Sequence, residues 1–309
     1  MQLPSFPIPP EQRLIRSFTG RAEAPIRTIW LSAASSARGE ISIEGLEAFL
    51  SGARTASLTE LRAVIHLDTM IGRLEVNLAP LLETLLHRSA SAGELVFAET
   101  MGFPPLDLGI FRQDAAQAAR TMVGDLIQGI EAGRLNPITG VRSKGTLETV
   151  RGIIGEGFEL GRTHAQSARL IREVIGLDDR RAGALAKYAA KLEAQGIPEK
   201  KRLRMIAAES KRKLQSRGLA VSRTESVRAA SIAQDMIWER AISEGQIPDV
   251  WEQEWVASPN AFNPEKCPSG ICKSLHHARA PIGGEFRPGI KHPPIHPSCG
   301  CARRLRRKE

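Results

Sequence analysis

The sequence predicts a mainly α-helical protein: a helical body followed by a small C-terminal module of strands and loops that a Cys/His cluster stabilises. Hydrophobic residues make up 42% of the 309 residues but aromatic residues only 5%, which favours packed helices over an aromatic-rich sandwich. Apolar residues recur at helical spacing in several segments before residue 250. All four cysteines lie between Cys267 and Cys301, in a Pro/Gly-rich stretch without a helical period.

The chain divides into five predicted segments. Because four prolines stand among the first ten residues, residues 1–20 are expected to form an extended arm, either a docking arm or a plain tail. The remaining segments are a helical N-terminal domain over residues 21–160, a second helical domain over 161–249, the Cys/His module over 250–302 and a basic tail over 303–309.

The N-terminal domain contains one long predicted helix and two shorter ones. Ser57-x-x-Glu60 is a capping box that opens the long helix. We expect Pro80 to kink or split this helix after the preceding alanine, and further helices at about 112–133 and 146–160. A narrow apolar seam marks the face that packs on a neighbouring helix: Val64, Leu67, Ile71, Leu74, Leu78, Leu81 and Leu85.

The second helical domain begins with another capping box, Thr163-x-x-Gln166. A basic helix face follows over residues 199–217, and Ser222-Arg-Thr-Glu225 predicts a third capping box that opens a separate helix ended by Gly245. Two apolar stripes predict buried faces, the first ended by Gly196: Ala182, Leu185, Ala189 and Leu192, then Ala230, Ala233, Ile237 and Ala241. Near residue 250, Trp251 and Trp255 begin the strand-and-loop module.

The charge balance and the chain start bear on partners and location. The net charge is +9, which attracts polyanions such as nucleic acid. The basic face over 199–217 is open to two readings, a solvated surface or a nucleic-acid contact. The chain start lacks the pattern of a secretion signal, and no run of about 18 apolar residues occurs, so we expect neither secretion nor membrane insertion.

The clustered cysteines and a histidine carry the chemistry. Cys267 and Cys272 are followed, after an interval of 23 residues, by His296-Pro-Ser-Cys299-Gly-Cys301. Two ligand pairs on two turns predict tetrahedral coordination, and zinc fits this donor set best. Five donors compete for four places: Cys267, Cys272, His296 and Cys301 are preferred, with Cys299 as the competitor for the last place. Four free or partly paired thiols in an unmetallated loop remain the alternative.

Catalytic patterns are weaker. His276, His277 and His292 lie near the cysteines and suggest a metal nuclease, but adjacent histidines on a regular element cannot both bind one ion, and no carboxylate cluster accompanies them. The glycines between residues 155 and 161 have the wrong spacing for a dinucleotide site, and no Gly-x-Ser-x-Gly motif occurs. The sequence therefore predicts a protein that is not an enzyme.

A series of motifs follows a fixed order between about residues 160 and 303. They are Ile171-Arg172 with Ile175-Gly176-Leu177, Ala186-x-Tyr188, Arg223-Thr224-Glu225, Trp238, Gly245, Trp255-Val256, the first cysteine pair, and Pro293-Pro294-x-His296-Pro297-x-Cys299-x-Cys301. In this order the chain resembles the phage Mu F-like minor head proteins, the phage head morphogenesis domain family. The last string is the most specific. The first cysteine pair departs from the family, in which the two cysteines are usually closer.

The resemblance implies a minor head (capsid) protein of a tailed phage, which acts in procapsid assembly and in DNA packaging or ejection. Its implied partners are the portal protein, the major capsid or scaffold protein, and packaged DNA through basic surfaces, with no membrane. Its implied location is the head interior or portal vertex of the virion, and the host cytoplasm during assembly. Two alternatives stay open: a zinc-stabilised nucleic-acid-binding protein and, less favoured, a metal-dependent nuclease. Two interpretations of the basic tail are equally supported, a DNA contact and a disordered end.

Overall fold

The computed structural model describes residues 10–52, 57–101, 111–133, 142–248, 250–263, 267 and 269–308. It divides into two compact units: Met1–Pro25 with Ala79–Thr121 and Ala220–Glu309, called unit 1, and Ile26–Leu78 with Met122–Leu219, called unit 2. Each unit combines segments that are distant in sequence, whereas the sequence predicts consecutive domains.

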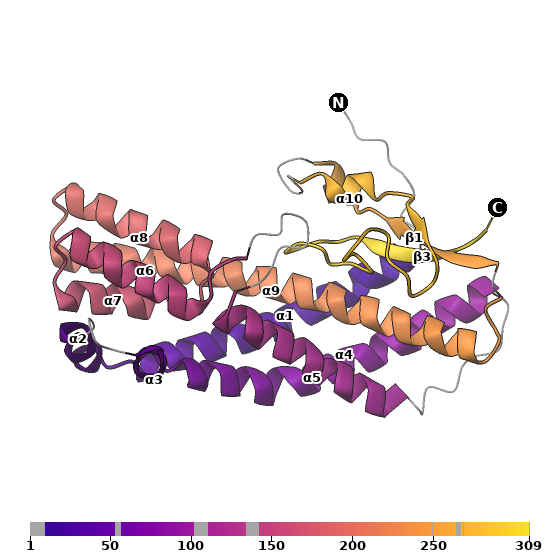
Figure 1. The fold of residues 1–309 in the computed structure, drawn as a ribbon, viewed down its shortest axis with the longest axis horizontal. Helices are drawn as coiled ribbons and strands as arrows, with labels where there is room; N and C mark the ends of the chain where they lie inside the picture. Colours follow the sequence, from indigo (N-terminus) through magenta and orange to yellow (C-terminus); the bar gives the residue numbers. More distant parts are fainter. Residues whose placement is uncertain are drawn as a thin grey trace. The chain divides into compact units, whose positions relative to one another are not determined.

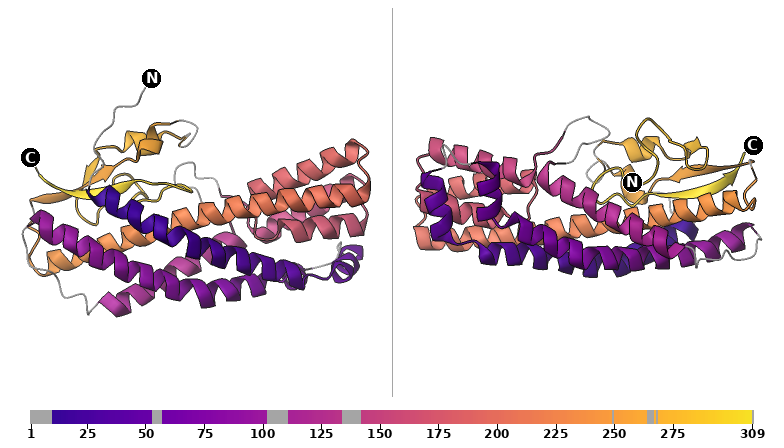
Figure 2. Two further views of the ribbon diagram at one scale, coloured as in Figure 1. Left: turned by 180° about the vertical axis from the view of Figure 1, so that it is seen from behind. Right: turned by 60° about the horizontal axis from the view of Figure 1, so that its bottom comes forward.

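The described residues are mainly helical, which confirms the predicted fold class (Figures 1 and 2). The described helices that precede the C-terminal module are α1 (Pro10–Glu40), α2 (Ile43–Ser51), α3 (Leu58–Val64), α4 (Leu67–Met101), α5 (Phe111–Glu131), α6 (Thr146–Glu159), α7 (His164–Val174), α8 (Asp179–Ala194) and α9 (Glu199–Ser243). The C-terminal module contains β1 (Trp251–Val256), a 3₁₀ helix (Pro259–Phe262), α10 (Ile271–Ser274), β2 (Arg279–Ala280) and β3 (Ala302–Arg307). None of the described helices is long and apolar enough to cross a membrane.

Two predicted capping boxes open helices as expected. The Thr163 hydroxyl accepts a hydrogen bond from the Gln166 N–H at 3.2 Å, and the Gln166 side chain accepts one from the Thr163 N–H at 3.1 Å. Ser57 and Glu60 make the same reciprocal pair at the start of α3. Local side chains thus satisfy backbone N–H groups that the first helical turn leaves without partners.

The first long helix differs from the prediction in where it breaks. Helix α3 ends at Val64 and α4 begins at Leu67, while Pro80 lies inside α4, which it does not split. The proline is exposed, so its ring faces solvent, and leucines that follow it in the same helix, such as Leu82, are buried. Packing of the apolar face therefore outweighs the roughly 3 kcal/mol that an interior proline costs a helix.

The extended arm predicted for residues 1–20 is wrong for its second half. Helix α1 begins at Pro10, so residues 10–20 are helical. Proline is favoured at the first helical position, because its fixed φ suits the helix and the N–H that it lacks has no partner there. Residues 1–9 lie outside the described residues.

Helix α9 is continuous from Glu199 to Ser243, so the prediction of a new helix at Ser222 is also wrong. Ser222 is fully buried inside the helix, and the Ser226 hydroxyl donates to its carbonyl oxygen at 2.8 Å. In unit 2, Gly218 lets the same helix approach Trp30, whose Cδ1 would lie 3.4 Å from a Cβ at this position. The predicted small-residue stripe from Ala230 to Ala241 is buried, as expected.

The C-terminal module is a three-stranded antiparallel sheet with the strand order β2-β1-β3. Glu254 of β1 pairs with Arg304 of β3, and Val256 pairs with Ala302. Residues 302–307 are therefore a strand and not a disordered end, one of the two interpretations of the basic tail, because they complete the backbone hydrogen bonds of β1. Within unit 1 the module packs on α9 as expected, through a buried cluster of Val227, Ala230, Val256 and Ala302.

Candidate metal centre

The first two donors are placed by a turn and a short helix. The Gly270 N–H donates to the Cys267 carbonyl at 3.0 Å, and Gly270 has a φ of 64°, a left-handed conformation that favours glycine. Helix α10 begins at the next residue and carries Cys272. The tight turn brings the two thiols together despite the four residues between them.

The other three donors come from a second turn before β3. The Cys299 N–H donates to the His296 carbonyl at 3.1 Å, with Pro297 and Ser298 at the two central positions. Ser298 has a φ of 59°, and its N–H donates to the Thr224 hydroxyl of α9 at 3.0 Å. This hydrogen bond joins the turn to the helix within unit 1, so His296 and Cys299 are held at a fixed place.

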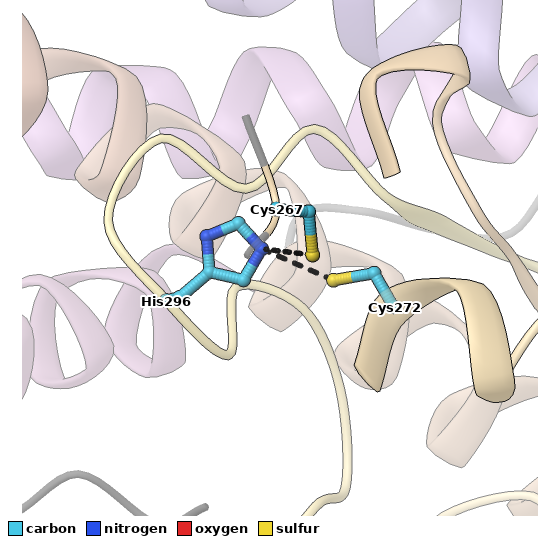
Figure 3. Close-up of side chains that lie close together, drawn as sticks. All are labelled: Cys267, Cys272 and His296. Atoms are coloured by element: carbon cyan, nitrogen blue, oxygen red, sulfur yellow. Dashed lines mark hydrogen bonds between the residues drawn. The ribbon is translucent and has the colours of Figure 1, made fainter. Parts of the chain in front are cut away.

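The two turns face one another. The Nε2 atom of His296 lies 3.6 Å from the Cys267 sulfur and 3.1 Å from the Cys272 sulfur (Figure 3). The sulfurs of Cys272 and Cys299 are 3.8 Å apart. All four cysteines are buried, and none forms a disulfide.

The donors form two overlapping groups of three that could each hold a metal ion. One group is Cys267, Cys272 and His296, the other is Cys272, Cys299 and Cys301, and the donor atoms within each lie within 4.8 Å of one another. Cys272 belongs to both groups and is therefore the centre of the cluster. All five predicted donors are brought together, whereas the choice between Cys299 and Cys301 for the last place stays a prediction.

The electrostatics of the cluster favour one thiolate next to a charged imidazole. Hydrogen bonds from Cys272 and then Cys301 hold the pKa of Cys299 well below its usual range. Although burial alone would lower the pKa of His296, the hydrogen bond and negative charge of Cys299 raise it to about 9. The pKa of Cys272 is raised, chiefly by its hydrogen bond to Cys299. A soft cation would replace these protons, since thiolate and neutral imidazole are the ligand forms.

A pocket of about 300 Å³ borders the cluster within unit 1. Its lining includes Cys267, Cys272, His296, Cys301 and, from α9, Arg223. Arg223 forms an ion pair with Glu23 of α1 at 3.1 Å. Three of the cysteines and the half-buried His296 therefore border a pocket, through which a metal ion could reach the cluster.

The nearby histidines lie outside the two donor groups. His277 contacts the Glu254 carboxylate through Nδ1, and the Nδ1 atom of His276 accepts a hydrogen bond from the Ala257 N–H at 3.3 Å. The Nδ1 atom of His292 lies 2.7 Å from the Pro293 carbonyl. Each of these histidines thus makes a polar contact with another group of the module.

Sequence reasoning missed a buried charge network beside the centre. Arg303 is fully buried and donates to Asp235 at 2.6 Å, to Gln253 at 2.9 Å and to the Ser231 carbonyl at 2.8 Å, and its guanidinium stacks on Trp238. On the sheet, Glu254 accepts hydrogen bonds from two further arginines of β3: Arg304 and Arg306. The sequence signal is Glu-x-Glu in β1 and Arg-x-Arg in β3, a complementary charge pattern that favours pairing of the two strands.

Comparisons with protein-family models, curated proteins and solved structures find no match to this chain.

Proposed function

We propose that this protein is a minor head protein of a tailed phage, which associates with the portal and acts in procapsid assembly, with a zinc ion holding its C-terminal module in place. The support for the head-assembly part is the motif order between residues 160 and 303 and the resemblance that it carries. In this proposal the chain is an assembly component, and its buried polar residues serve packing and not catalysis.

The observation that carries the proposal is the hydrogen bond between Thr224 and Ser298, at 3.0 Å. It joins two strings of the resemblance, Arg223-Thr224-Glu225 and the His-Pro-Ser-Cys turn, which are 74 positions apart in the sequence. A motif pair that meets in space supports the view that the strings belong to one functional module. Trp255, from a third string, is buried in the same cluster as the cysteines.

Zinc is the metal that we propose for the centre. A tetrahedral zinc site with a metal–sulfur distance of about 2.3 Å and a metal–nitrogen distance of about 2.0–2.1 Å has S–S edges of about 3.8 Å and S–N edges of about 3.6 Å. The Cys272–Cys299 distance is 3.8 Å and the Cys267–His296 distance is 3.6 Å. The Cys272–His296 distance of 3.1 Å would have to lengthen by about 0.5 Å to reach such an edge. Thiolate and imidazole are ligands that suit zinc and not magnesium or calcium.

The role of the ion would be structural. Four of the five donors are enough to fill a tetrahedral site, and structural zinc sites are those in which the protein supplies all four ligands. The ion would tie α10 to the turn before β3, and the turn is tied to α9 through Thr224. Apparent binding energies of roughly 10–16 kcal/mol are known for structural zinc in small modules, enough to decide whether a loop-rich segment folds.

The test is co-expression of the intact chain with the portal protein of its own phage, followed by co-purification and a zinc assay on the same sample. A stable complex that carries about one zinc per chain supports both parts of the proposal. The Cys272→Ser variant, prepared in the same way, should lose zinc. If no complex forms while the zinc-loaded chain binds DNA in a strongly salt-dependent way, the nucleic-acid-binding alternative replaces the head-assembly proposal. Metal-dependent DNA cleavage that His276→Ala or His277→Ala abolishes would instead establish the nuclease alternative.

A further inference from the structure

Unit 2 contains a small pocket that is rich in arginine. It has a volume of about 160 Å³ and is lined by residues of α7, α8 and the first turns of α9. Arg162, which directly precedes the N-cap residue of α7, also lines it. Four arginines and two glutamates are among its lining residues: Arg162, Arg169, Arg172, Arg202, Glu173 and Glu193. The formal charge of this set is positive, which makes the pocket a candidate site for an anion.

Arg162 is the unusual member of this set. Its side chain is only 4% exposed, and its Nη1 and Nη2 atoms are buried with no hydrogen-bond partner in the part of the chain that the structure describes. The polar contact that its guanidinium makes is Nε to the Glu193 carboxylate, at a long 3.5 Å. Buried N–H groups without partners are unfavourable, so a cation in this position needs a further acceptor.

The glutamates of the pocket do not supply that acceptor. Glu193 is shared, because its other oxygen lies 3.4 Å from Arg202. Glu173 lies 3.6 Å from Arg38, which is outside the pocket lining, and 3.8 Å from Arg172. Each carboxylate is thus divided between two arginines at distances longer than a charge-assisted hydrogen bond of about 2.7–2.9 Å.

We propose that this pocket binds a phosphate group. The arginines that line the pocket come from α7, from α9 and from the residue before the N-cap of α7, so guanidinium groups from different elements border one cavity. Several guanidinium groups suit the oxygens of a tetrahedral anion. A planar carboxylate would need one forked arginine. Pockets that enclose drug-sized ligands measure about 300–1,000 Å³, so 160 Å³ suits one phosphate group and not a whole nucleotide. The phosphate could belong to a nucleic-acid backbone or to a small phosphate compound.

The proposal is independent of the metal centre and of the head-assembly function, since all of these residues belong to unit 2. Its test is calorimetric titration of the intact chain with inorganic phosphate, at constant ionic strength in chloride. We expect saturable binding of one phosphate per chain, weakened at least 10-fold by Arg162→Met. The matched control is Arg180→Met, an exposed arginine of α8 that does not line the pocket, which should leave the affinity unchanged.

A second variant guards against a misfolded Arg162→Met protein. Arg172 has a side chain that is 38% exposed, so Arg172→Gln should keep the native circular dichroism spectrum and still weaken phosphate binding several-fold. Repeating the titration with a short DNA duplex separates the two sources of phosphate. Competition between the duplex and phosphate, with the same dependence on Arg162, identifies a backbone phosphate. Phosphate binding without such competition identifies a small phosphate compound.

Two results would overturn the proposal. One is the absence of saturable phosphate binding by the natural chain, and the other is equal phosphate affinity of the natural chain and of a folded Arg162→Met variant. If phosphate does not bind but a polyglutamate peptide does, in a way that depends on Arg162, the ligand of the pocket is a carboxylate and not a phosphate.

Discussion

The hydroxyl of Thr224 in α9 accepts a hydrogen bond at 3.0 Å from the N–H of Ser298, in the turn that carries His296 and Cys299. The same hydroxyl donates to the Ala220 carbonyl of its own helix at 2.7 Å, so both of its hydrogen-bonding roles are used. One side chain therefore connects the helix to the metal-binding turn.

Replacing Thr224 by valine keeps the shape of the side chain and removes this acceptor. We expect Thr224→Val to lower the free energy of unfolding by about 1 kcal/mol, because the Ser298 N–H loses its protein partner. Thr224→Ser keeps the hydroxyl and is the matched control. Urea denaturation of the zinc-loaded proteins measures both, and equal midpoints for the two variants would show that the hydrogen bond does not matter.

Arg303 and Asp235 form a buried ion pair at 2.6 Å. We expect Arg303→Met to destabilise the protein by about 3–5 kcal/mol, because it leaves the largely buried Asp235 carboxylate without its counter-charge. The double variant Arg303→Met/Asp235→Leu should recover much of this loss, since it removes both charges. Thermal unfolding of the natural chain, the two single variants and the double variant gives the coupling, and strictly additive effects would contradict a direct interaction.

The Glu254 carboxylate predicts a dependence of stability on pH. Burial would raise its pKa, but hydrogen bonds from Arg304 and His277 outweigh burial and lower the pKa to about 2. An unfolded glutamate titrates near 4.3, so the stabilisation is fully present above about pH 5 and is lost as the pH falls towards 2.

The comparison that isolates this effect is Glu254→Gln. At pH 7 the variant should be less stable by roughly 2–4 kcal/mol, and the difference from the natural chain should shrink between about pH 5 and pH 2.5. Both proteins carry the same Cys/His cluster, so the acid lability of the cluster affects them alike. A difference that stays constant over this pH range would contradict the assigned role of Glu254.

Gly176, in the turn between α7 and α8, has a φ of 82°, and a Cβ there would lie 2.6 Å from the Cβ of Ala34. We expect Gly176→Ala to cost more than the roughly 1 kcal/mol of a strained backbone alone, because the clash adds to it. Gly183 lies inside α8, and a Cβ at this position would meet no atom within 4 Å, so Gly183→Ala should stabilise the helix by up to about 1 kcal/mol. Thermal unfolding that ranks the two variants in the opposite order would show that the turn can rearrange.

The sequence predicts helix starts where the signal is local. Thr163 and Gln166 are three residues apart and bond to one another, so their pattern alone locates the start of α7. Ser222 and Glu225 show the same pattern in the middle of α9. There the outcome depends on burial against distant segments, which a four-residue pattern does not contain.

In the candidate site, too, the features that depend on local sequence can be predicted and those that depend on distant segments cannot. The spacing of the cysteines and His296 predicts that they meet, because two short turns are enough to bring them together. Arg303 belongs to the predicted basic tail, whose run of arginines leaves a DNA contact and a disordered end equally open from sequence. Its burial depends on pairing between β1 and β3, whose paired residues Trp255 and Arg303 are distant in sequence.

We propose that one metal ion connects the two turns through Cys272, the residue shared by both donor groups. The most direct measurement is the metal content of the intact purified chain by mass spectrometry, alongside the Cys272→Ser variant and a serine variant outside the cluster, Ala280→Ser. We expect about one zinc per chain in the natural protein and in Ala280→Ser, and none in Cys272→Ser, which should also have a lower melting temperature. A natural chain without bound metal, or a Cys272→Ser variant with full metal content, would contradict it.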